Sequence, residues 1–174
     1  PASLLSIGER AFAGAFTGSE SSHLDLSAAA ALRTIGREAF RACNTLTQLT
    51  LPVNLTEIGE AAFSECYNLT GTLVLPTLLT TVGTEAFYNC KNLTGTLVLP
   101  ASLTQLGERA FMRCAAQEGL DLSASRLTVI GAEVFKESLS SASAGKLIIP
   151  SGVTAVAASA FEDTGFPEAD LPQT

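Results

Sequence analysis

The sequence predicts a solenoid of the α/β class, built from about seven units of 23–24 residues that each contribute a short helical segment and a short parallel strand. The first observation is a six-residue motif, Ile-Gly-x-x-Ala-Phe, which recurs along the chain with Val or Leu sometimes replacing Ile. The second is a Leu-x-Leu-Pro motif that recurs between the copies of the first. A fixed spacing of this size indicates a stack of like units. The phenylalanines of the motif are Phe12, Phe40, Phe63, Phe87, Phe111, Phe135 and Phe161, separated by 28, 23, 24, 24, 24 and 26 residues.

The first half of each unit predicts a short helical segment. In one copy, apolar residues occur at positions i, i+3, i+7 and i+11, the spacing of one helical face. These residues are Leu55, Ile58, Ala62 and Cys66. The glycine of the motif tolerates the turn into the segment. An acidic residue follows, where it complements the positive end of a helix. The acidic residues are Glu9, Glu38, Glu60, Glu85, Glu108 and Glu133.

The second half of each unit predicts a short strand, because leucines alternate with β-branched or polar residues. The proline cannot donate to a strand ladder and therefore marks the end of the strand. The expected strands precede Pro52, Pro76, Pro100 and Pro150, with variants at Leu24–Leu26 and Leu120–Leu122. One unit cannot bury its own apolar side, whereas stacked units can.

We expect one solenoid domain over residues 1–174, with units near 1–27, 28–52, 53–76, 77–100, 101–123, 124–150 and 151–174. A solenoid needs polar caps on its terminal units. Residues 1–7 already resemble the middle of a unit, and residues 165–172 resemble another strand half. We therefore expect the chain to belong to a longer array, or its ends to contact neighbouring chains.

The whole unit, Leu-Thr-x-Ile-Gly-x-x-Ala-Phe-x-x-Cys-x-x-Leu-x-x-x-Leu-x-Leu-Pro, resembles the BspA-like leucine-rich repeat, most closely over 55–76 and 79–100. The resemblance implies a right-handed leucine-rich-repeat coil. It also implies a secreted or cell-surface protein that acts in adhesion or protein–protein interaction. Three departures are an insertion at 14–22, another at 138–145, and Ala157 in place of the motif glycine.

Composition excludes several functions. The formal net charge is −7 over 174 residues, and an acidic chain is a poor ligand for nucleic acid or anionic lipid. No apolar run approaches the length that spans a bilayer, and no signal peptide is visible. Phosphate-binding loops, dinucleotide fingerprints, zinc-protease motifs and nucleophile elbows do not occur. We therefore expect no catalysis, cofactor or metal.

The cysteines, Cys43, Cys66, Cys90 and Cys114, each lie three residues after a motif phenylalanine. The same position holds Ala15, Ser138 and Thr164 in the remaining units, so it favours a small side chain. We expect a column of buried free thiols, since a free cysteine behaves as a small hydrophobe. Disulfides between neighbouring units and a metal site remain alternatives.

Three glycosylation sequons begin at Asn54, Asn68 and Asn92. Asn68 and Asn92 share a column with Asn44, where asparagine typically satisfies the backbone groups of a turn. We favour this structural role and expect Asn54 to be the most exposed acceptor.

A partner is expected on the strand face, through the outward side chains of the strands. These are His23, Asp25, Gln48, Thr50, Thr72, Val74, Thr96, Val98, Asp121, Lys146 and Ile148. The stretch of Thr50, Val74 and Val98 is apolar, which marks a contact surface or simply the preference of sheets for β-branched residues. Aromatic residues and arginine are missing from this face, so each unit would bind weakly and many units would act together.

These features favour a non-catalytic protein–protein interaction or adhesion module that binds its partner on the strand face. The alternative is a structural scaffold subunit within a large multiprotein assembly. The resemblance favours a cell-surface or secreted protein, and the scaffold would lie in an intracellular assembly. The partner is a protein in both interpretations, either another subunit or a surface receptor or matrix protein.

Overall fold

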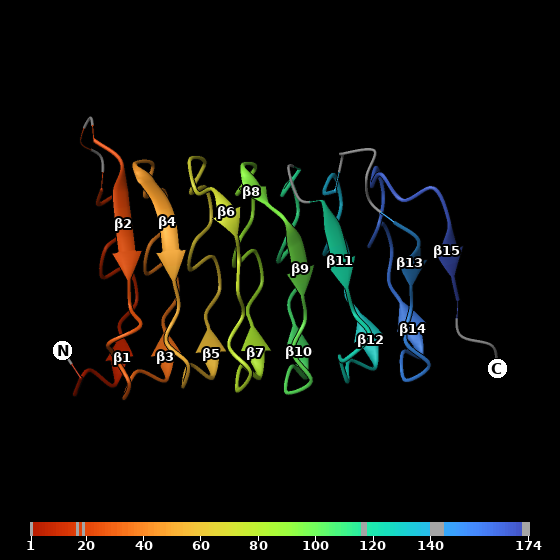
Figure 1. Ribbon diagram of the computed structural model, residues 1–174, viewed down its shortest axis with the longest axis horizontal. Helices are drawn as coiled ribbons and strands as arrows, with labels where there is room; N and C mark the ends of the chain where they lie inside the picture. The colour runs from red at the N-terminus through yellow and green to blue at the C-terminus, as the bar shows by residue number, and fades with distance from the viewer. Residues whose placement is uncertain (1, 17, 19, 116–117, 140–144, 172–174) are drawn as a thin grey trace.

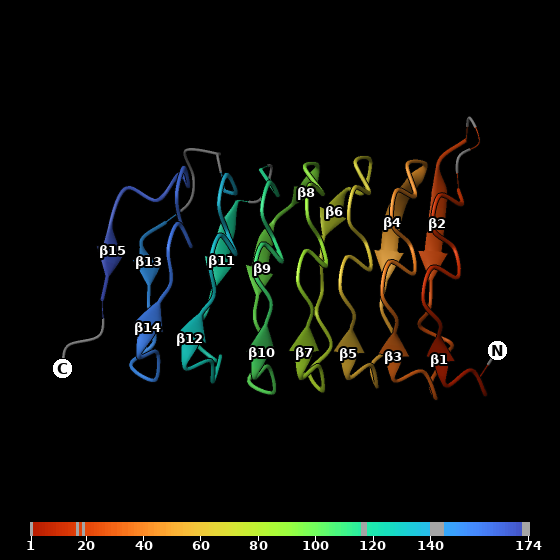
Figure 2. The ribbon, with the colours of Figure 1, turned by 180° about the vertical axis from the view of Figure 1, so that it is seen from behind.

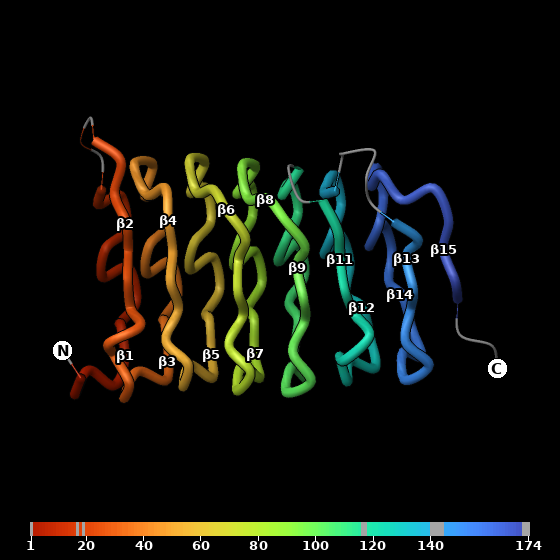
Figure 3. The backbone as a smooth tube through the Cα atoms, viewed as in Figure 1, coloured from red at the N-terminus to blue at the C-terminus, as the bar shows by residue number. Residues whose placement is uncertain are grey.

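The computed structural model describes residues 2–16, 18, 20–115, 118–139 and 145–171. The chain winds as a solenoid of parallel strands, with β1 and β15 at opposite ends of an elongated array (Figure 1). We number its coils one to seven by their motif phenylalanines, from Phe12 to Phe161. Each coil passes through a lower and an upper row of strands, which the tube in Figure 3 traces as successive loops.

The lower row is formed by the Ile-Gly end of each motif, which the sequence assigned to the helical segment. Five of its strands form one parallel sheet in the order β1-β3-β5-β7-β10, and β12 pairs with β14 in a separate sheet. Their bounds are β1 Ser6–Ile7, β3 Thr34–Ile35, β5 Glu57–Ile58, β7 Thr81–Val82, β10 Gln105–Leu106, β12 Val129–Ile130 and β14 Ala155–Val156.

The upper row contains the Leu-x-Leu strands, and it forms parallel pairs instead of one continuous sheet. The pairs are β2–β4, β6–β8, β9–β11 and β13–β15. Their bounds are β2 Ser22–Asp25, β4 Leu46–Thr50, β6 Gly71–Thr72, β8 Leu93–Thr94, β9 Thr96–Val98, β11 Gly119–Asp121, β13 Leu147–Ile148 and β15 Ala169–Asp170. The strand expected at residues 73–75, before Pro76, was wrong: β6 ends at Thr72, and residues 73–76 belong to no strand.

The expected helices were wrong: the described residues contain no helix. The motif phenylalanines of neighbouring coils stack with ring centroids 5.1–5.9 Å apart, whereas packed helices need about 8–10 Å between their axes. A coil at this spacing has no room for a helix on the phenylalanine side, where the sequence placed it. The apolar pattern correctly identified the inward side chains, but a chain of tight turns presents them equally well.

Alternating backbone conformations replace the helix. In coil two, Glu38 and Ala42 have positive φ angles of 51° and 56°, and their N–H groups donate to carbonyl groups of coil three at 2.8 Å. The N–H of Phe40 between them does the same, also at 2.8 Å. Ala39 and Arg41 instead donate to residues three positions back, which closes turns within the coil. Every second N–H group, which in a helix would bond within the segment, therefore bonds to the next coil.

The phenylalanine column runs the full length of the described solenoid, as the repeat spacing predicted. Neighbouring motif rings are nearly parallel, with interplanar angles of 3–14°. The five rings of coils two to six are fully buried, whereas Phe12 is 44% exposed. Each inner ring therefore contacts an aromatic face on both sides.

The motif glycines are needed for close approach of backbones, and not for the turn that the sequence suggested. Gly36, Gly59, Gly83 and Gly107 do not have positive φ angles. A Cβ atom on Gly83 would lie 2.6 Å from the backbone nitrogen of Glu60, and one on Gly36 would lie 2.9 Å from the carbonyl oxygen of Ile7. Gly8, in the first described coil, has open space at the same position.

The acidic residues after the glycines have no helix end to complement. Within the described part of the chain, five of the six, Glu108 being the exception, instead form ion pairs with arginines of their own or neighbouring coils. Glu38 lies 3.5 Å from Arg10, 3.3 Å from Arg37 and 3.7 Å from Arg41, and Arg109 lies between Glu85 and Glu133. The arginines are exposed, and such surface pairs each contribute about 0–1 kcal/mol.

We predict that Phe87→Ala lowers the free energy of unfolding by about 3–5 kcal/mol, because it leaves a cavity between two buried rings. Urea denaturation measures the change. Phe12→Ala is the matched control and should cost clearly less, since that ring is exposed and stacks on Phe40. Equal losses for the two variants would contradict the importance of stacking on both faces.

We also predict that Gly83→Ala destabilises the protein by about 1–3 kcal/mol, since its methyl group must push two backbones apart. Gly8→Ala should stay within about 0.5 kcal/mol of the parent protein, because nothing lies close to its Cβ position. Thermal unfolding followed by circular dichroism compares them. If both substitutions were harmless, the close-approach explanation would be wrong.

Candidate interaction surface

The upper row places alternate side chains inside and outside, as the strand pattern predicted. Leu73, Leu75, Leu97 and Leu99 are buried. The intervening Val74 is 72% exposed. Thr50, Val98 and Ile148 also face solvent, Asp25 is exposed and Asp121 is half-buried. The sequence therefore identified the outward row of this face correctly, although no residue contact tests its role in binding.

Apolar grooves flank the extended segment that contains Val74. The first lies between coils two and three, has a volume of about 480 Å³, and is lined by residues that include Thr50, Val53, Val74, Pro76 and Thr77. The second lies between coils three and four, has a volume of about 260 Å³, and is lined by residues that include Thr72, Val74, Thr96, Val98 and Pro100.

The grooves occur where the upper ladder is open. In other coils this ladder is closed by bonds such as Leu26 N–H to the Thr50 carbonyl at 2.9 Å, or Leu99 N–H to the Asp121 carbonyl at 3.0 Å. Among the described residues, no corresponding bond joins the segment 73–75 to either neighbour. The middle coil thus presents both an exposed valine and free backbone edges.

Polar residues of the predicted surface lie mainly beside this apolar centre. His23 Nε2 lies 3.2 Å from Thr50 Oγ1, and Gln48 is exposed next to them. Asp25 accepts a hydrogen bond from Ser27 N–H at 2.9 Å, and hydrogen bonding from the side chain and then the backbone of Ser27 lowers the pKa of the Asp25 carboxyl group. In coil six, Lys146 Nζ lies 2.7 Å from Asp170 Oδ1.

The structure therefore brings together five of the predicted residues at the grooves: Thr50, Thr72, Val74, Thr96 and Val98. His23, Asp25 and Gln48 lie at the edge on β2 and β4. Further along the array, Asp121 lies on β11, Ile148 on β13 and Lys146 directly before β13. Sequence reasoning missed Val53, Pro76, Thr77 and Pro100, which follow the strands. The hydrophobic residue after Pro52 was the available signal.

The cysteine column has a second cause besides small size. All four cysteines are free and buried, and each thiol donates to the carbonyl oxygen of the phenylalanine one coil earlier, at 3.1–3.3 Å. Ser138 makes the equivalent bond to Phe111. Ala15, at the same position of the first described coil, has no side-chain donor. Thr164 instead donates within its own coil, to Phe161.

Burial shapes the chemistry of these thiols. It raises the pKa of the Cys90 thiol to about 12, and it raises the pKa of Cys114 as well. A thiol held in its neutral form is a poor nucleophile and a poor metal ligand. The described residues include no cluster of His, Cys, Asp and Glu that could hold a metal ion.

The sequon asparagines bond to the preceding coil. Asn68 Nδ2 donates to the Asn44 carbonyl at 2.7 Å, Asn92 Nδ2 to the Tyr67 carbonyl at 2.8 Å, and Asn54 Nδ2 to Ala30 at 2.9 Å. This is the structural role that the column indicated. The expectation that Asn54 is the most exposed was wrong: Asn54 is half-buried, and Asn68 is exposed.

Comparison with known proteins identifies the same repeat. The chain matches the family model described as the BspA type leucine-rich repeat region, six copies, over residues 7–140 and 69–174. No curated protein was matched. Within the described residues, no helix has the length and hydrophobicity required to cross a membrane.

Several solved structures share the fold. A leucine-rich repeat protein from Bacteroides ovatus has a TM-score of 0.81 and 24% identity over 97% of this chain and 41% of its own. A leucine-rich cell surface protein from Faecalibacterium prausnitzii has a TM-score of 0.77 and 23% sequence identity, over 95% of this chain and 42% of its own. A leucine-rich repeat protein from T. pallidum has a TM-score of 0.67 and 23% sequence identity, over 95% of this chain and 66% of its own. The chain thus spans less than half the length of the first of these proteins.

We predict that the buried thiols weaken the protein in alkali. Below the ordinary thiol pKa near 9.0 both states are protonated and stability is complete; above it the unfolded thiols ionise while Cys90 stays neutral up to about pH 12. Stability should therefore fall by up to about 1.4 kcal/mol per pH unit for each such thiol in this window.

The matched variant is Cys90→Ser with Cys114→Ser, which keeps the donor as Ser138 does and removes two titrating groups. Urea denaturation between neutral pH and about pH 10.5 should show a smaller loss for this variant. An equal loss in both proteins would contradict the assignment. Thiol titration should also find four free cysteines after unfolding without reductant.

Proposed function

Because the chain belongs to the BspA-type leucine-rich repeat family, we propose that it is a non-catalytic protein-interaction or adhesion module whose partner binds the upper-row strand face. Proteins built from leucine-rich repeats are generally interaction modules, and the array offers a long, regular surface for such an interaction. The single observation that carries the proposal is the pair of apolar grooves beside Val74.

The grooves favour an extended, aliphatic segment of a partner protein. Val53 and Val74 are 68% and 72% exposed, so a partner that covers them removes apolar surface from water. The backbone of residues 73–75 has free hydrogen-bonding groups on both sides, which an extended segment can satisfy. Neither groove contains a charged residue, so burial of a partner there leaves no unpaired charge.

A cell-surface or secreted setting is part of this proposal. Its support is the Faecalibacterium prausnitzii structure, which is described as a leucine-rich cell surface protein. At 23% identity that likeness concerns the fold, and the location of this chain is inferred by analogy with it. Adhesion through many weak contacts also suits a face that lacks aromatic and arginine side chains.

The test is selection of linear peptides from a random phage-displayed library on the immobilised protein. We expect enriched aliphatic peptides whose affinity falls about tenfold or more in a Val74→Asp, Val98→Asp variant, since a carboxylate cannot be buried against them. Leu5→Asp is the control, because Leu5 is 67% exposed and lies outside both grooves.

Binding that is equally weakened by the control variant, or unaffected by the two groove substitutions, would refute the strand face as the binding surface. Failure to select any peptide would favour the scaffold alternative, in which larger folded surfaces pack against the solenoid. Circular dichroism of all three proteins excludes loss of folding as the cause.

A further inference from the structure

In the part of the chain that the structure describes, the lower row of strands is interrupted between coils five and six. In the other coils, the residue that directly follows each lower-row strand donates its backbone N–H to a carbonyl of the preceding coil. The donors are Gly36, Gly59, Gly83, Gly107 and Ala157, each at 2.8 Å. Within the described residues, no such bond joins Gly131 to Leu106, and β10 and β12 lie in separate sheets. Figures 1 and 2 show this wider interval from both sides.

The same two coils remain joined on the phenylalanine side. Phe111 N–H donates to the Val134 carbonyl and Arg113 N–H to the Lys136 carbonyl, both at 2.9 Å. The Phe111 and Phe135 rings still stack, although their 5.9 Å separation is the largest in the column. The coils therefore separate as a wedge that is closed at the ring column and open at β10 and β12.

Val134 accounts for the opening. The equivalent position holds alanine in every other coil: Ala11, Ala39, Ala62, Ala86, Ala110 and Ala160. A Cβ atom on Gly131 would meet Val134 Cγ2 at 3.4 Å and the Leu106 carbonyl oxygen only at 3.5 Å, whereas closed coils bring backbone atoms within 3 Å of the same point. The larger side chain occupies the space that the preceding backbone otherwise fills.

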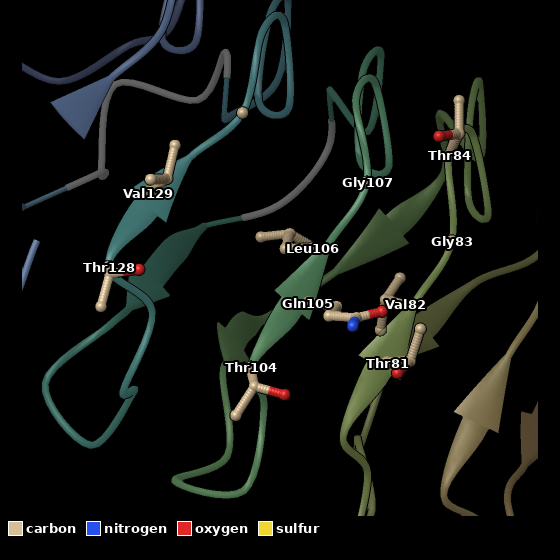
Figure 4. Close-up of a pocket in the computed structure, with 11 residues that line it drawn as sticks. Thr81, Val82, Gly83, Thr84, Thr104, Gln105, Leu106, Gly107, Thr128 and Val129 are labelled. Atoms are coloured by element: carbon tan, nitrogen blue, oxygen red, sulfur yellow. The ribbon is translucent and has the colours of Figure 1, made fainter.

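The opening is a cleft of about 400 Å³ between the two strand edges. In Figure 4, Thr104, Gln105 and Leu106 line one side, and Thr128 and Val129 line the other. Leu106 is half-buried, whereas Ile35, Ile58 and Val82 in the same column are at most 1% exposed. An aliphatic side chain is therefore missing from the position that would cover Leu106.

The ladder chemistry identifies the backbone groups at this cleft. Between coils four and five, the Thr80 and Val82 carbonyls accept bonds from the N–H groups of Thr104 and Gly107. By the same register, the open edge of β10 offers the Thr104 and Leu106 carbonyls, and the open edge at β12 offers the Thr128 and Gly131 N–H groups. Among the described residues, no protein group bonds to these four.

We propose that this cleft binds an extended polypeptide segment, which adds as a strand to the edge of β10 and covers Leu106 with an aliphatic side chain. The occupant must donate two backbone N–H groups at the spacing of a β-strand, which a sugar or a nucleotide does not provide. The site lies on the lower row, away from the grooves of the proposed function, and does not depend on that function.

The probe is the acetylated and amidated hexapeptide Leu-Thr-Gln-Leu-Gly-Glu, which copies residues 103–108. This segment contains β10, which in the protein adds in parallel to the edge of β7. Titrated into isotope-labelled protein, it should shift the amide resonances of Thr128, Val129 and Gly131 and of residues 104–107. The matched peptide with sarcosine in place of glycine lacks one donor and should bind about tenfold more weakly.

Val134→Ala should close the cleft, slow hydrogen exchange of the Gly131 amide and weaken the parent peptide about tenfold. Three results would each overturn the proposal: no shifts at millimolar peptide, equal binding of the sarcosine peptide, or a Gly131 amide that exchanges as slowly as that of Gly107 in the parent protein. The sarcosine comparison uses the parent protein, so it stands even if Val134→Ala lowers stability.

Discussion

The distance between neighbouring coils, slightly above 5 Å, is the constraint on which the structure depends. Stacked phenylalanines maintain it on one side, and motif glycines allow two backbones to meet on the other. Parallel strands, which lie about 4.8 Å apart, fit this spacing, whereas helices do not. The alternating signs of φ follow, because only a chain that turns its N–H groups outward can bond to neighbours on both sides. Each positive-φ residue costs about 1–2 kcal/mol locally, which the bonds between coils offset.

Sequence alone predicted the stack and its columns, because a residue type that recurs at one position of every unit must contact its own copies. It did not predict the backbone between those columns. The spacing of Leu55, Ile58, Ala62 and Cys66 states which side chains face inward, and both a helix and a series of tight turns satisfy it. The choice depends on the distance to the next coil, which no single unit encodes. The glycine was misinterpreted for the same reason.

For the candidate surface, too, the sequence predicted the direction of side chains but not the backbone arrangement. Alternation along the strands correctly placed Val74 and Val98 outside, since successive residues of a strand face opposite sides. The grooves beside them could not be predicted, because they result from ladder bonds that fail to form. Two glycines with positive φ, Gly71 and Gly95, accompany that failure, and β6 pairs with β8 at an offset of 22 residues instead of 24. Such a register shift is decided between coils and leaves no clear mark within one unit.

Both proposed binding surfaces lie where the regularity of the scaffold is interrupted. Each interruption leaves a few backbone groups without protein partners, at a cost of about 1–3 kcal/mol for each group that water cannot reach. The array tolerates this because the ring column continues past both openings, so that Phe63–Phe87 and Phe111–Phe135 still stack where the ladders do not close. A single change in one column, such as valine for alanine at position 134, can therefore create a cleft without unfolding the neighbouring coils. The repeat supplies stability, and its exceptions leave the unpaired backbone groups on which both proposed binding sites rest.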